Sequence, residues 1–207
     1  MRRDLCALWL AASVLLFGSA AFAIPIAHLQ LQSQPGDFIG QGGTYDVYYN
    51  RPGDPIIDAR ISGRLANGQP AMVSFSLDTA AGDRYANLDF GTNQLGIALA
   101  PGSYTNAQRA AFASPGHPGL DVSFQHRGSN TLTGEFTISE ITFTPDLQSI
   151  LSLVASFEQH SEGAAPALFG QFEYRAAGIP EPGTGLLLGV GLALFGGGRR
   201  RLKPALR

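Results

Sequence analysis

Three residue types, cysteine, tryptophan and lysine, are almost missing from this 207-residue chain. Cysteine and tryptophan occur once each, at Cys6 and Trp9, and lysine occurs once, at Lys203. All three positions lie close to a chain end. The long stretch between them therefore has no disulfide, no thiol nucleophile and no cysteine ligand for a metal.

Basic residues are also scarce in the middle of the chain. Residues 24–182 hold seven arginines and no lysine against 15 aspartates and glutamates, a net charge of −8, although the whole chain carries only −2. A domain with this balance repels phosphate backbones and anionic lipid. We expect no nucleic-acid partner.

Sequence patterns of common catalytic sites are missing too. The chain has no G-x-S-x-G, no phosphate-binding loop, no H-E-x-x-H and no dinucleotide fingerprint. One polar set would support metal binding or acid–base catalysis if the fold gathered it: His126 and His160 with Asp121 and Glu158. More simply, each histidine ends its strand. We expect no enzyme activity, no catalytic residues, no metal site and no cofactor.

The first 23 residues have the layout of a secretory signal peptide. Two arginines (2–3) precede an apolar run (5–17), and Ala21 and Ala23 form an A-x-A cleavage site. Cleavage would leave Ile24 as the first residue, and the Sec machinery and signal peptidase would be the partners. The alternative is a retained membrane helix.

The last 29 residues combine a short motif, an apolar stretch and a basic cluster. As a helix, the apolar residues 184–198 would reach about 22 Å, short of a hydrocarbon core of roughly 30 Å. The arginines that follow would stay cytoplasmic and leave the upstream domain outside. The parts of the pattern are Pro180, Glu181 and Pro182, then the apolar stretch, then Arg199, Arg200 and Arg201.

This order of motif, apolar helix and arginine cluster resembles the PEP-CTERM sorting signal of Gram-negative bacteria, with a six-residue extension at 202–207. The resemblance implies recognition by an exosortase, a membrane protease that cuts near the Pro-Glu-Pro motif. It also implies a role linked to exopolysaccharide or biofilm. The protein would be anchored transiently in the inner membrane and then reach the cell surface, the outer membrane or the medium. A plain tail anchor and an apolar helix buried in the domain are the alternatives.

Short alternating runs separated by Gly/Pro turns predict an all-β domain over residues 24–178. Alternation is clear at 71–77 and 120–124, and a change of phase between Ile138 and Ile141 predicts a bulge or a change of face. We expect a single antiparallel β-sandwich, jelly-roll-like, flanked by the signal helix and a short C-terminal apolar helix.

Three local predictions accompany this fold. Asn67-Gly68 predicts a hairpin with a type I′ turn, which needs positive φ at both residues. Residues 105–112 form a short helical candidate. Asp37 is expected to cap the backbone of its own turn.

Two sets of residues are ligand candidates. Tyr45, Tyr48 and Tyr49 would form a sugar-stacking platform if they shared a face, but such tyrosines more often belong to a sheet core. Asp78 and Asp83 could supply oxygen ligands to calcium, but their spacing favours a solvated turn.

Much of the middle also resembles an uncharacterised bacterial secreted β domain. The resemblance rests on residues 35–40, 102–104, 118–120, 157–160 and 166–170. That domain carries a cysteine pair in the stretches that match 127–130 and 159–162, where this chain has Ser129 and Ser161. The resemblance implies that these two serines lie on neighbouring strands or loops.

Three functions compete at this point. The first is an exported, non-catalytic protein of the cell surface or extracellular matrix. The second is a carbohydrate-binding module for exopolysaccharide. The third, a secreted hydrolase, would need two close carboxylates or a histidine-centred cluster in an open cleft.

Overall fold

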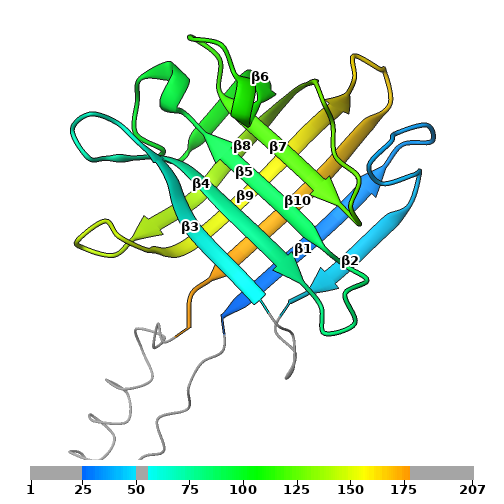
Figure 1. The fold of residues 1–207 in the computed structure, drawn as a ribbon, viewed down its shortest axis with the longest axis horizontal. Coiled ribbons are helices and arrows are strands. Elements are labelled where there is room, and N and C mark those ends of the chain that lie inside the picture. The colour runs from blue at the N-terminus through cyan, green and yellow to red at the C-terminus, as the bar shows by residue number, and fades with distance from the viewer. Residues whose placement is uncertain (1–24, 50–55, 178–207) are drawn as a thin grey trace, which may run out of the picture.

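A computed structural model describes residues 25–49 and 56–177, which form one mixed, curled sheet of ten strands, a half-barrel (Figure 1). The expected signal peptide and its cleavage site, the Pro-Glu-Pro motif, the apolar helix and the arginine cluster all lie outside the described residues. Within the described part, no helix is long and apolar enough to cross a membrane.

The strands follow one another along the chain with two single-turn 3-10 helices between them. Their order across the sheet is β2-β1-β10-β9-β8-β6-β7-β5-β4-β3. The bounds are β1 (Ile26–Ser33), β2 (Thr44–Tyr48), β3 (Ile56–Arg64), β4 (Pro70–Asp78), β5 (Ala86–Gly91), η1 (Asn93–Leu95), β6 (Gly102–Arg109), η2 (Ala110–Phe112), β7 (Gly119–Phe124), β8 (Leu132–Phe143), β9 (Ile150–Ser161) and β10 (Ala167–Arg175).

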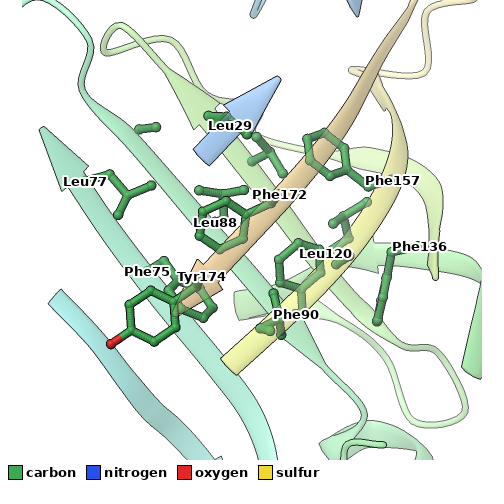
Figure 2. Packing of buried hydrophobic residues seen from close by; sticks show 14 of the residues in the cluster. Leu29, Phe75, Leu77, Leu88, Phe90, Leu120, Phe136, Phe157, Phe172 and Tyr174 are labelled. Carbon is green, nitrogen blue, oxygen red and sulfur yellow. The ribbon is translucent and has the colours of Figure 1, made fainter. Parts of the chain in front are cut away.

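The sheet curls so that its two halves face each other across one apolar core (Figure 2). Phe75 on β4 meets Phe172 on β10 with ring centroids 4.8 Å apart, and Phe90 on β5 meets Phe136 on β8 at 5.4 Å. Because successive strand residues point to opposite faces, the apolar positions fill this core and the polar positions face outward.

A buried glutamine strengthens the middle of the sheet, where strand pairing is sparse. β7 pairs with β6 at only two positions, so Val122 lacks a strand partner on that side. The fully buried Gln159 on β9 accepts a hydrogen bond from Val122 N and donates one to Val122 O, both at 2.9 Å. One side-chain amide thus replaces a strand neighbour and satisfies both backbone groups.

The all-β prediction is confirmed, but the expected antiparallel sandwich is corrected to one continuous sheet. β6 and β7 are parallel, and they join the two halves that a sandwich would keep as separate sheets. The helical prediction for 105–112 is wrong for most of its length, because β6 pairs with β8 and only 110–112 form a 3-10 turn. Strand pairing overrides local preference here.

The predicted bulge is confirmed, since the register of β8 against β9 shifts between Ile138 and Glu140. The predicted hairpin between β3 and β4 is also confirmed. Its turn type is wrong, because Gly68 has φ +83° while Asn67 is not among the residues with positive φ. A turn with a single left-handed glycine closes this hairpin.

Candidate functional site

A groove of about 540 Å³ lies on the outer face of the half-sheet formed by β2, β1, β10, β9 and β8. Successive side chains of a strand point to opposite faces of the sheet. The groove side chains therefore point outward, because each is next in sequence to a core residue that points inward. The outward side chains that line it are Gln30, Gln32, Thr44, Asp46, Glu135, Thr137, Ser156, Glu158, Phe169 and Gln171.

The groove combines amides, hydroxyls and carboxylates around one aromatic ring. Phe169 is half-buried, and its register partners on the adjacent strands are Gln32 and Glu158. Gln32, Gln171 and Ser156 are exposed, and their side chains have no hydrogen-bond partner among the described residues. These groups are therefore available to a ligand with hydroxyl groups and an apolar face.

A glycine under the groove, Gly170, makes room for a core side chain. A Cβ on Gly170 would lie 2.1 Å from the ring of Phe157, which packs over this position on the core side. The missing side chain lets the ring fill the core between β9 and β10. The next residues along the two strands, Phe169 and Glu158, then project outward into the groove.

Three carboxylates give the groove a negative charge. Glu135 on β8 and Glu158 on β9 are direct register partners, and Asp46 lies on β2. His160 Nε2 lies 2.9 Å from Glu158 Oε1. The hydrogen bond from His28 lowers the pKa of Asp46.

The three candidate tyrosines do not form a single platform. Tyr49 is fully buried and donates to Arg84 O at 2.7 Å, and Tyr45 packs against the core with its ring 4.7 Å from that of Phe124. Tyr48 points to the outer face and stacks on His28 at 3.9 Å. Only Tyr48 keeps an exposed ring.

A second cavity, of about 570 Å³, lies on the outer face of β3, β4, β5 and β7. Asp89 and Asp121 are direct register partners there, with Arg60 and Arg109 among the lining residues. Arg109 Nε donates to Asp121 Oδ2 at 3.0 Å. Burial raises the pKa of both aspartates despite this arginine, because desolvation penalises the charged carboxylate.

The histidine set is divided between these two places. His126 lines the Asp121 cavity and stacks on Tyr85 at 5.0 Å, whereas His160 lies beside Glu158 near the groove. Among residues 25–49 and 56–177, no group of three or more His, Cys, Asp or Glu residues could hold a metal ion. Asp78 and Asp83 instead bond within their turn, to Thr79 N at 2.8 Å and Thr79 Oγ1 at 2.7 Å.

Two structural predictions from the sequence are confirmed. Ser129 Oγ donates to Ser161 Oγ at 2.8 Å, and both serines are buried, so the loop before β8 and the end of β9 are neighbours. Asp37 is buried and accepts from Gly40 N at 2.7 Å and from Ile39 N at 3.3 Å, which caps its turn.

The groove was not predicted from the sequence. Asp121 was predicted as a member of a polar set, but its register partner Asp89 was not. The only signal was that Phe169, Gln171 and their groove neighbours occupy outward positions of alternating strands. Alternation separates inward from outward residues, but it does not tell which outward residues of distant strands share a hollow.

No protein-family model matches this chain, and no curated protein and no solved structure matches it either.

Proposed function

We propose that this chain is an exported, non-catalytic protein of the cell surface or extracellular matrix, sorted by an exosortase-type system. We further propose that its β domain binds the exopolysaccharide of that matrix in the groove. The observation that carries the binding role is the lining of this groove, where free amides and hydroxyls surround Phe169. Polysaccharides are recognised by this combination, because polar groups bind hydroxyls while a ring covers the apolar sugar face.

The export role rests on the two terminal segments and agrees with the layout of the domain. Ile26 at the start of β1 and Arg175 at the end of β10 are register partners. The first and last strands of the described domain therefore begin and end at neighbouring points. A C-terminal anchor would hold the domain at this end of β1 and β10, while the groove residues of these strands, such as Gln32 and Phe169, lie further along them.

Mass spectrometry of the protein from its native host tests export and sorting. We expect a chain that starts at Ile24 and ends near the Pro180-Glu181-Pro182 motif. Alanine at these three positions should leave the C-terminal segment attached, while the N-terminal cut is unchanged. An intact 207-residue chain in the cytosol would contradict the proposal.

Binding is tested with the full-length chain in mild detergent, in pull-downs with polysaccharide from the host matrix. Phe169→Ala should weaken binding about tenfold or more, since stacking and burial of one ring contribute on the order of 1–3 kcal/mol. Phe38→Ala is the matched control, because Phe38 is 52% exposed and does not line the groove. Equal loss in both variants would argue against the groove.

A second candidate function, hydrolysis of a glycosidic bond, is favoured by Asp89 and Asp121. Glycoside hydrolysis uses two facing carboxyls, of which one has a raised pKa and acts as the acid and the other acts as nucleophile or base. Asp89 and Asp121 face each other in the cavity, and burial raises the pKa of each. Release of reducing ends from matrix polysaccharide, abolished by Asp89→Asn, would support this candidate. No release by the wild-type protein would remove it.

A further inference from the structure

The charges of the groove point to a narrower class of ligand, and this inference rests on the proposed binding of polysaccharide. We infer that the groove selects a glycan that carries free amino groups over neutral and anionic glycans. Three carboxylates, Asp46, Glu135 and Glu158, line the groove, and none of its described lining residues is an arginine or lysine.

The closest of these charges face each other directly. Glu135 and Glu158 are paired across β8 and β9, which places their Cβ atoms roughly 4.5–5.5 Å apart. Like charges in this position destabilise a sheet. A cation bound between them would remove the repulsion, and a ligand ammonium group is such a cation.

The neighbouring histidines leave one carboxylate free. His28 bonds to Asp46, and His160 bonds to Glu158. Glu135 is exposed, and among the described residues no side chain or backbone group bonds to its carboxylate. Glu135 is therefore the group in the groove that we expect to receive the ammonium.

An anionic glycan would meet the opposite situation. A uronate chain would bring its carboxylates against Glu135 and Glu158, and the described residues that line the groove include no guanidinium or lysine ammonium to neutralise them. Across the domain the net charge of −8 adds a weaker, longer-range repulsion of the same sign. A neutral glycan would keep the hydroxyl contacts and gain nothing from Glu135.

The test compares three oligosaccharides of equal length on the full-length chain in mild detergent. They are a glucosamine oligomer, its fully N-acetylated form and an oligouronate, titrated at about pH 6. We expect the glucosamine oligomer to bind about tenfold tighter than the acetylated one, the size of one charge-assisted hydrogen bond. The oligouronate should bind weakest, and added salt should reduce the preference.

Two charge-neutralising variants locate the effect. Glu135→Gln should abolish the preference for the amine and keep binding of the acetylated oligomer. Asp58→Asn removes the same unit of charge on β3, away from the groove, and should keep the preference. Equal loss in both variants would overturn the inference, because the acidity of the whole domain would then be responsible.

The other outcomes separate this inference from the function on which it rests. Equal binding of the amine and acetylated oligomers overturns the amine selection and leaves polysaccharide binding intact. Strongest binding of the oligouronate, or amine-independent binding that requires added calcium, overturns it as well. If none of the three binds and matrix polysaccharide also fails, both proposals are wrong.

Discussion

The buried contact between Ser129 and Ser161 offers a direct test of how this sheet is closed. The two hydroxyl oxygens lie 2.8 Å apart, in the loop before β8 and at the end of β9. We predict that cysteines at both positions form a disulfide in the folded protein. The side chains already point at each other, and both sites are almost fully buried.

The expected gain follows from the loop that the bond would close. The positions are 32 residues apart, and cross-linking a loop of this length lowers the entropy of the unfolded chain by an amount worth about 3–4 kcal/mol at 25 °C. The loss of the serine–serine hydrogen bond offsets about 1 kcal/mol of this gain. We therefore expect the oxidised variant to be about 2–3 kcal/mol more stable than wild type.

The assay is guanidinium denaturation of the Ser129→Cys/Ser161→Cys variant with and without reductant, in a Cys6→Ser background that removes the third thiol. Each single cysteine variant serves as a control and should show no dependence on reductant. Two free thiols in the folded, oxidised protein would refute the reasoning. So would equal stability of the oxidised and reduced forms.

Three further predictions concern the core and one carboxylate. Gln159→Leu should lower the free energy of unfolding by about 2–5 kcal/mol in denaturant titrations, because Val122 N and O would both be left buried without partners. Gly170→Ala should cost about 1–3 kcal/mol in the same assay, since the new methyl group would overlap the buried ring of Phe157. Asp89→Asn should raise stability at neutral pH, and the gain should vanish below about pH 4 in denaturation curves measured across pH.

The sign of the Asp89 effect follows from its raised pKa. The folded protein holds this proton more tightly than the unfolded chain, so stability falls as pH rises from the unfolded pKa through the folded one. An asparagine at this position does not ionise, so the folded protein has no buried charge to desolvate there. A variant less stable than wild type at neutral pH would contradict the prediction.

Matched variants control the two core predictions. Gln94 is exposed, so Gln94→Ala should change stability little compared with Gln159→Leu. Gly128 is also exposed, and a Cβ there would have its nearest neighbour at 3.4 Å, an ordinary contact, so Gly128→Ala should be nearly neutral. Equal effects at the control and test sites would show that packing is not the cause.

Local features of the fold could be predicted from sequence because their causes are local. The change of phase between Ile138 and Ile141 marked a bulge, and Asp37 marked a capped turn, since both depend on residues within a few positions. The hairpin at Asn67-Gly68 was also visible. Its turn type was not, because Gly68 N donates to Leu65 O, which makes Ala66 and Asn67 the central residues of the turn and leaves positive φ to Gly68 alone.

The candidate sites could not be predicted in the same way. Asp89 and Asp121 are 32 positions apart in sequence and become neighbours only because β5 pairs with β7. The tyrosines show the converse, since Tyr48 and Tyr49 are adjacent in sequence but face opposite sides of the chain. Register and strand order, which depend on long-range pairing, decide both outcomes.

By itself, the sequence determined the strand-rich class and the acidic balance of the domain, because composition and short-range alternation carry that information. Only the tertiary structure decided that the strands form one curled sheet, in which Gln159 bonds to β7 where its pairing with β6 is sparse. It also decided that Glu135, Glu158 and Phe169 share one groove. Such contacts join residues far apart in the chain, and they exist only once the strands have paired in one order and one register.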